Sequence, residues 1–209
     1  MAKILDTFLA EVEIKRDDIM TSGALDRLVL ASGGVARDFL GILRRSIVRA
    51  RERGDTARGE KIGVEDVNGG AGEYDSSKRE ELLRDTLDDR VRLEDEFAEI
   101  SRFAKKYSKA NVFLVDKDLP DTETAVIAEL VDLRLIHKVR TRVTVTTDRP
   151  GKIFEAYMLD VSQYTASRKM RDFQIVEFWR SDAEDVLRRP GLIYKEWDGG
   201  KVVTKKVPD

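Results

Sequence analysis

Arg37 is the first residue whose type and position could do chemistry. It follows the pair Gly33–Gly34 in the stretch LASGGVARDFL and lies in the first turn of an expected helix. The amino end of a helix is already positive, so an arginine there is unfavourable unless an anion answers it. The sequence leaves two candidates for this anion open, the carboxylate of the neighbouring Asp38 or an external anionic ligand.

A second group of cations lies between positions 134 and 152, where Asp148 is the one acidic residue. We expect this segment to form two strands joined by the turn DRPGK, which places cations along a strand and at a hairpin tip. Cations held in this way can contact the phosphates of a nucleic acid. The candidate nucleic-acid-binding residues are Lys138, Arg140, Arg142, Arg149 and Lys152.

Arginines also crowd the expected helix from about Val35 to Arg53 and its exit. Their guanidinium groups form a second basic patch, and their aliphatic stems could instead cover apolar surface. The residues of this patch are Arg44, Arg45, Arg49, Arg51, Arg53 and Arg58.

The composition excludes several kinds of site. Cysteine is absent, which excludes disulfides and thiolate chemistry, and the single histidine, His137, is expected at the surface or half-buried.

GDTARGEK has the glycine spacing of a P-loop, but Glu60 and Lys61 stand where that loop needs lysine and then Ser or Thr. The acidic runs LDDR and EDEF alternate with arginines, as solvated helix faces do. We therefore expect no catalytic residue, resident cofactor or metal site in this chain.

Helical periodicity predicts three helices at the start of the chain. The first is amphipathic, the second is SGALDRLVLAS with Ser22 as N-cap, and the third ends at Gly54. Glycines and charges then dominate residues 54–75, the expected linker, in which Gly69 and Gly70 interrupt a short helix. The apolar face expected on the third helix comprises Phe39, Leu40, Leu43, Ile47 and Val48.

A long helix is expected from Ser77, which has capping-box spacing to Glu80, to about Lys109. After it come a strand (NVFLV), a helix from Asp121, a hairpin (IHKVRTRVTVTT and KIFEAYMLDV), a short helix (SDAEDVLRRPG) and a terminal hairpin (LIYKEWDGGKVVTKKV). A helix that leads into a hairpin with a basic tip is typical of the end of a winged helix. The helix itself carries four acidic residues and would repel a major groove along most of its length.

The expected fold is therefore mainly α with a smaller β part (α+β). We expect a helical bundle over residues 1–75, a connecting helical segment over 76–110 and a winged-helix domain with a C-terminal hairpin over 111–209. The apolar fraction of 41% suits a folded protein, and no stretch approaches the roughly 18 apolar residues of a membrane span. These features favour a cytoplasmic location without membrane contact.

The stretch ALDRLVLASGGVARDFLGIL, followed by a basic helix and KIGVEDV, resembles the helical lid domain of AAA+ and related STAND ATPases. In origin-initiator-like members a winged helix follows the lid. The resemblance covers roughly residues 2–67 by motif and the winged helix by pattern. It implies that Arg37 corresponds to the sensor 2 arginine, which reaches the γ-phosphate of ATP bound by the core.

The Walker A lysine, Walker B acid and sensor 1 residue of that family have no counterparts in this sequence. The resemblance therefore implies a module that is not an enzyme by itself, with ATP and magnesium bound only by an ATPase core supplied in cis or in trans. Its winged helix would contact double-stranded DNA or a protein partner. Two alternatives remain open, a self-contained winged-helix DNA-binding regulator that dimerises through its helical half, and a protein-interaction scaffold.

Overall fold

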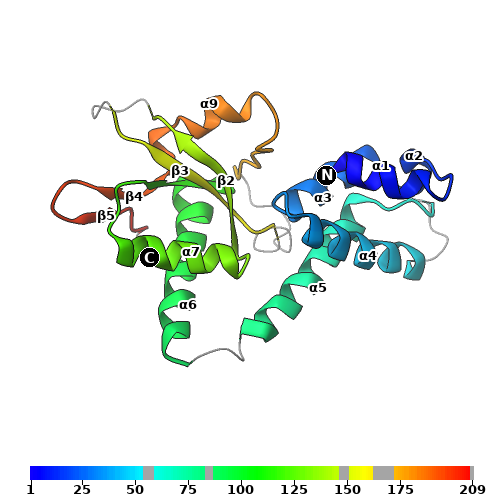
Figure 1. Ribbon diagram of the computed structural model, residues 1–209, viewed down its shortest axis with the longest axis horizontal. Helices are drawn as coiled ribbons and strands as arrows, with labels where there is room; N and C mark the ends of the chain where they lie inside the picture. Colours follow the sequence, from blue (N-terminus) through cyan, green and yellow to red (C-terminus); the bar gives the residue numbers. More distant parts are fainter. Residues whose placement is uncertain (54–58, 83–86, 146–150, 162–171, 208–209) are drawn as a thin grey trace. The chain divides into compact units, whose positions relative to one another are not determined.

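The computed structural model describes residues 1–53, 59–82, 87–145, 151–161 and 172–207, without the side chains of residues 77–82 and 87–90. The chain divides into two compact units, Met1–Glu81 and a second that begins at Leu82. The described part of the first unit is helical, and the second is built on a five-stranded sheet (Figure 1). The expected fold class, mainly α with a smaller β part, is confirmed.

The first unit contains five helices in its described residues: α1 (Ala2–Ala10), α2 (Arg16–Ile19), α3 (Ser22–Ala31), α4 (Ala36–Glu52) and α5 (Val64–Leu82). Thr21, not Ser22, is the N-cap of α3, and its hydroxyl accepts a hydrogen bond from the Ala24 N–H at 3.2 Å. The expectation for Ser22 was wrong by one position, because Ser22 already has helical geometry.

The corner between α3 and α4 depends on its two glycines. Gly33 has φ 55° and Gly34 has φ 82°, both in the left-handed region that side chains disfavour. The backbone reverses there, and α4 restarts at Ala36 with Val35 as an N-cap that offers no side-chain bond. Arg37 is thus fixed in the first turn of α4, as the sequence indicated.

One face of α4 packs into the helical unit. Phe39 and Leu43 are buried there, but Leu40 is 38% exposed and Val48 is 46% exposed. The apolar face predicted for this helix was therefore too wide. A helix turns by about 100° per residue, so Leu40 and Val48 lie on a different side from Phe39.

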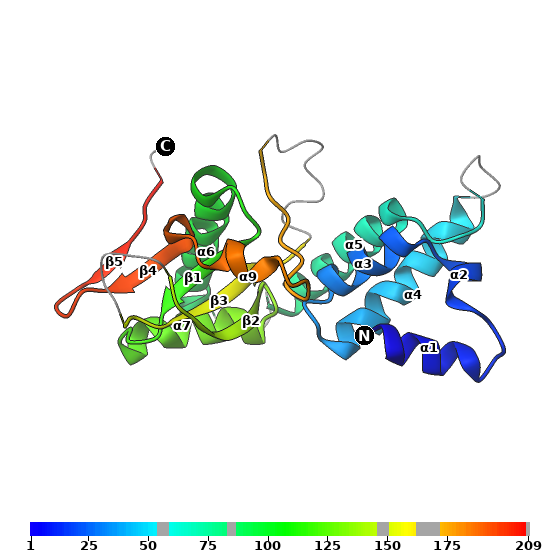
Figure 2. The ribbon, with the colours of Figure 1, turned by 90° about the horizontal axis from the view of Figure 1, so that it is seen from above.

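The expected linker is wrong over its second half, because α5 begins at Val64 and continues through Gly69 and Gly70. The helix also passes Ser77, which was expected to start a new one, and extends to Leu82. The glycines allow α5 to cross closely over α4 (Figure 2). A Cβ atom at position 70 would lie 2.9 Å from the Ser46 Oγ and 3.0 Å from the Ser46 N.

The second unit begins with α6 (Leu87–Arg102) and a π-helical turn, Phe103–Ser108, that ends at Lys109 with φ 50°. The expected strands and helices follow: β1 (Val112–Asp116), α7 (Asp121–Asp132), β2 (Ile136–Val143), β3 (Phe154–Leu159), α9 (Ala183–Leu187), a 3₁₀ turn (Pro190–Leu192), β4 (Ile193–Trp197) and β5 (Val202–Thr204). The order of strands in the sheet is β2-β3-β1-β4-β5. Strand β1 is its centre, antiparallel to β3 and parallel to β4.

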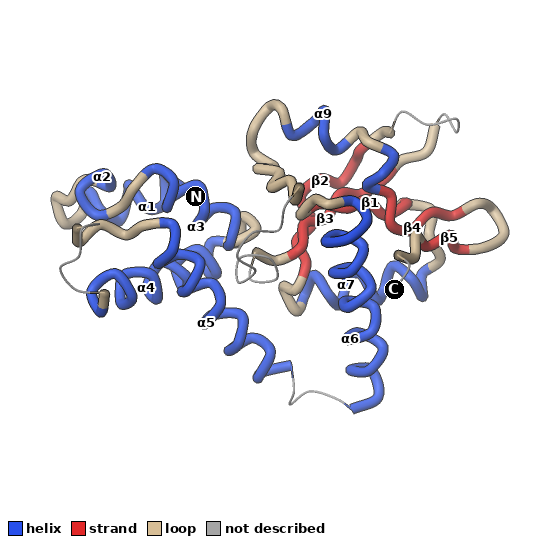
Figure 3. The backbone as a smooth tube through the Cα atoms, turned by 180° about the vertical axis from the view of Figure 1, so that it is seen from behind, coloured by secondary structure: helices blue, strands red, loops and turns tan. Residues whose placement is uncertain are grey.

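Helices cover both faces of this sheet. Views from opposite sides place α7 and α6 on one face and α9 on the other (Figures 1 and 3). The core between them is aromatic, since the ring of Phe113 lies 5.7 Å from Tyr157 and 5.9 Å from Tyr194. Lys195 of β4 connects both helices to the sheet. Its Nζ lies 2.9 Å from the Glu96 Oε2 of α6 and 2.7 Å from the Glu123 Oε2 of α7.

The winged-helix expectation is not confirmed. Helix α7 does lead into the antiparallel hairpin of β2 and β3, but that hairpin is one edge of a five-stranded mixed sheet. The segment expected to connect two domains is also divided, because the boundary between the units falls at Glu81 and Leu82. Helix α6 therefore belongs to the second unit and packs against α7.

Gly70→Ala should destabilise the first unit, because its Cβ would meet the backbone and hydroxyl of Ser46. We expect urea denaturation to show a loss of about 1–3 kcal/mol in the free energy of unfolding. Gly72→Ala is the matched control in the same helix, since its Cβ would meet nothing within 4 Å. The control should keep or raise stability by up to about 1 kcal/mol, and an equal loss in both variants would contradict the close crossing.

Candidate functional sites

Three arginines at the α5 side of α4 are used inside the first unit. Arg45 lies 4.9 Å from the centre of the Tyr74 ring, and Arg49 forms an ion pair with Glu73. Arg53, the C-cap, pairs with Asp66 at 3.2 Å and donates to the carbonyls of residues 59 and 61. These cations hold α4 to α5 and the segment before it.

The remaining arginines of α4 form an exposed row that we call the arginine face: Arg37, Arg44 and Arg51. They are seven residues apart, and a seven-residue step nearly completes two helical turns, so they share one side of the helix. Within the described residues none of the three has an ion pair or hydrogen bond. The exposed Leu40 and Val48 lie between them in sequence. Arg58, also expected in this patch, lies outside the described residues.

Asp38 does not form an ion pair with Arg37. Its side chain is buried, with no exposed surface, and accepts a hydrogen bond from the Tyr74 hydroxyl at 3.0 Å. Arg37 is exposed and makes no ion pair with it. Of the two anions left open by the sequence, Asp38 therefore forms no ion pair with Arg37.

Burial, followed by the hydrogen bond to Asp38, raises the pKa of Tyr74 to about 12. The nearby charges of Arg37 and Arg45 partly oppose this shift, since they favour the phenolate. The protonated phenol is therefore the form that holds Asp38 in the interior across the neutral range.

Strand β2 carries three of the candidate nucleic-acid-binding residues, and an irregular register sends them to different faces. Lys138 lies opposite Tyr157, and Arg140 lies opposite Ala156, so two steps on β2 match one step on β3. Opposed residues share a face, whereas consecutive residues of β3 alternate between faces. Lys138 and Arg140 therefore point to opposite sides of the sheet, although simple alternation predicts one side for both.

Each face has a hollow of its own. The one on the α7 side, of about 590 Å³, is predominantly acidic, with Asp116, Asp121, Asp132 and Glu155 against Lys117 and Lys138. The one on the α9 side, of about 380 Å³, is predominantly basic. Its lining is Arg140, Arg142, Val143, Thr144, Glu184, Leu187 and Arg188.

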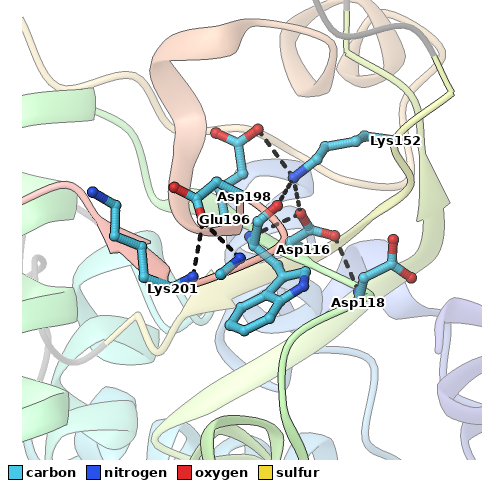
Figure 4. A network of polar contacts seen from close by, with 8 residues as sticks. Asp116, Asp118, Lys152, Glu196, Asp198 and Lys201 are labelled. Atoms are coloured by element: carbon cyan, nitrogen blue, oxygen red, sulfur yellow. Dashed lines mark hydrogen bonds and ion pairs between the residues drawn. The ribbon is translucent and has the colours of Figure 1, made fainter.

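Two of the candidate cations are neutralised within the second unit. Lys138 pairs with Glu155 at 2.8 Å and lies 5.5 Å from the centre of the Tyr157 ring. Lys152 pairs with the buried Asp116 at 2.6 Å and with Glu196 at 3.2 Å, and donates to the Trp197 carbonyl (Figure 4). Arg149 lies outside the described residues.

Arg142 has no ion pair or hydrogen bond in the described parts of the chain, and Arg140 donates only to the Phe178 carbonyl, at 3.3 Å. Arg188 could not be found from the sequence, because nothing in the sequence relates α9 to β2. The arginine face was not expected as a unit, although its seven-residue spacing was a signal for it.

His137 is buried rather than exposed or half-exposed, so that expectation was wrong. Its Nε2 lies 2.9 Å from the Asp160 Oδ2, and the side chains of both residues are at most 5% exposed. The pair sits where β2 and β3 meet, at the end of the sheet where Ile136 opposes Leu159. Because both side chains are buried, we assign the pair to the core.

The described residues show no cluster of three or more His, Asp or Glu side chains suited to a metal ion. None of their helices combines the length and apolar character needed to cross a bilayer. Comparisons with family models, with curated proteins and with solved structures found no match to this chain.

Lys152→Met should lower the free energy of unfolding by about 2 kcal/mol or more, because the buried Asp116 carboxylate would lose its cation. Lys201→Met is the control, since Lys201 is exposed and its backbone N–H makes the turn contact to Asp198. Urea denaturation should show a change below about 0.5 kcal/mol for the control. Equal effects would contradict the structural role of Lys152.

Stability should fall as the pH rises from about 10 to about 12, because the folded protein keeps the Tyr74 proton that the unfolded chain loses. Subtracting the alkaline absorbance titration at 295 nm of Tyr74→Phe from that of the native protein should reveal one tyrosine that ionises near pH 12. At neutral pH the variant should lose about 1–3 kcal/mol, since a buried carboxylate loses a donor. A difference curve centred near pH 10 would contradict the contact with Asp38.

Proposed function

We propose that this chain is a non-catalytic module of a nucleotide-dependent ATPase, whose core lies elsewhere in the same polypeptide or in a separate one. Arg37 contacts the terminal phosphate of nucleotide held by that core. The arginine face provides the surface that meets the core, and the second unit contacts DNA or a protein partner. The resemblance of the SGGVAR corner to the sensor 2 region of AAA+ and STAND lids supports this role.

The proposal rests on the surroundings of Arg37. Arg37 is exposed and has no ion pair or hydrogen bond among the described residues, although its helix uses Arg45 and Arg49 internally. A cation in the first turn of a helix is unfavourable without an anion, and the neighbouring Asp38 is committed to Tyr74. The position therefore favours a ligand with concentrated negative charge, and a nucleotide phosphate has that property.

The surface around Arg37 suits a protein that holds such a ligand. Leu40 and Val48 are exposed beside Arg44 and Arg51, and apolar residues with arginine are enriched at protein interfaces. Arg51 stands fourteen residues beyond Arg37, about 21 Å along the helix. One end of the face can then reach the nucleotide while the rest contacts the protein around it.

A second candidate function is a DNA-binding regulator that works without an ATPase. The basic hollow between β2 and α9 favours it, because Arg140, Arg142 and Arg188 all line that hollow. The two functions are compatible in one chain, since the arginines belong to different units.

Arg37→Ala in the intact ATPase should lower kcat for ATP hydrolysis at least tenfold, as loss of a charged contact to a reacting phosphate does. Lys3→Ala is the control, because it removes an exposed cation of α1 in the same unit that does not belong to the arginine face. Steady-state kinetics should show a kcat for the control within about twofold of the native value, since exposed surface substitutions away from a site have small effects.

The first measurement is the intact mass of the natural gene product by mass spectrometry. The same preparation is used to identify any ATPase that copurifies with it. A heavier chain with a P-loop, or a copurifying ATPase, gives the enzyme for the kinetic test. A product of 209 residues with no associated ATPase would overturn the proposal. Unchanged kcat in Arg37→Ala would remove Arg37 from it.

A further inference from the structure

We propose that the hollow between β2 and α9 is a phosphate-binding site for the backbone of double-stranded DNA, with Arg140, Arg142 and Arg188 as its ligands. This inference deepens the DNA contact of the proposed function and rests on that part of it. It adds Arg188 to the binding residues and removes Lys138 and Lys152. It requires no nucleotide and no ATPase core.

The lining of the hollow has an excess of positive charge. Three guanidinium groups line it against the single carboxylate of Glu184, which gives a formal excess of two positive charges. Glu184 pairs with Arg188 four residues along α9 and leaves the other two arginines unopposed by any acidic lining residue. Arginine presents a planar fork of donors that matches the oxygens of a phosphate.

The shape of the hollow also suits a backbone phosphate. Its floor contains Val143, 8% exposed, and Leu187, 2% exposed, while the three arginines are exposed around it. At about 380 Å³ and open to solvent, it has room for a sugar–phosphate unit of a continuous chain. The hydroxyl of Thr144 is one more donor on its lining.

The irregular pairing of β2 makes the site specific to one face. If β2 alternated regularly, Lys138, Arg140 and Arg142 would share a side. The register shift sends Lys138 to the acidic hollow below α7 and leaves Arg140 and Arg142 facing α9, where Arg188 joins them. Among its described residues the second unit thus has a basic hollow and an acidic hollow on opposite sides of the sheet, and the basic one suits a DNA duplex.

The electrostatics of DNA make the duplex the favoured source of phosphate. A duplex carries about one negative charge per 1.7 Å of its axis, so a cationic hollow on an open surface gains from counterion release. The hollow between β2 and α9 is open to solvent, so it would not surround a small phosphorylated molecule. A free phosphate remains the other source of the same chemistry, and the experiment separates the two.

The test measures binding of the full chain to a fluorescein-labelled 20-base-pair duplex by anisotropy over a series of KCl concentrations. We expect a Kd on the order of 10⁻⁵ M near 0.1 M salt and a steep loss of affinity as salt rises. Arg140→Gln, Arg142→Gln and Arg188→Gln should each weaken binding about threefold or more and reduce the salt slope by about 0.9.

Lys138→Gln is the matched control, because it removes a cation from the same strand on the opposite face. It should leave the Kd within about twofold, since it contacts no phosphate in this arrangement. Circular dichroism and thermal melting establish that every variant is folded. Equal weakening by Lys138→Gln and the arginine variants would overturn the site, as would absence of binding in 50 mM KCl.

Inorganic phosphate, added as a competitor and in thermal melts, tests the alternative source. Stabilisation by millimolar phosphate without duplex binding would overturn the assignment to DNA. Because duplex binding involves neither ATP nor Arg37, its failure would leave the ATPase proposal standing, and a failed Arg37→Ala test would leave this site standing.

Discussion

The ion pair between Asp116 and Lys152 is the interaction on which the second unit depends. Asp116 ends the central strand β1, and its side chain has no exposed surface, so its charge must be answered within the protein. Lys152 supplies the cation just before β3, and the Trp197 N–H donates to the same carboxylate from the end of β4. One buried charge thereby fixes both neighbours of β1 at the same end of the sheet.

This requirement also sorts the cations of the chain into two classes. Lys138, Lys152 and Lys195 each neutralise carboxylates within the second unit, and Arg49 and Arg53 do so within the first. In a chain with 37% charged residues and a net charge of −2, a cation that is paired in this way is not available to a ligand. Exposed arginines that lack such a partner are therefore the informative ones. In the described residues they include Arg37, Arg44 and Arg51 on the arginine face of α4, and Arg140 and Arg142 in the hollow beside α9, where Arg188 is paired with Glu184.

Periodicity and turn chemistry predicted most of the elements. Strand β1 is a short apolar run, α7 follows a clear start at Asp121, and the last hairpin turns at Asp198, whose carboxylate accepts from the N–H groups of Gly200 and Lys201. The prediction failed at Gly69–Gly70, where glycine was interpreted as a helix breaker. There the glycines serve a close crossing of helices, and packing outweighs their low helix propensity.

The sequence by itself determined the fold class, the corner at Gly33–Gly34 and the place of Arg37 in the first turn of its helix, because these depend on local backbone preferences and apolar spacing. Only the tertiary structure decided which charges are available. The burial of Asp38 and Asp116, the register shift after Lys138 and the approach of Arg188 to β2 involve residues distant in sequence or a pairing between strands. Local pattern holds no information on such contacts, since desolvation and pairing arise only when separate segments pack together.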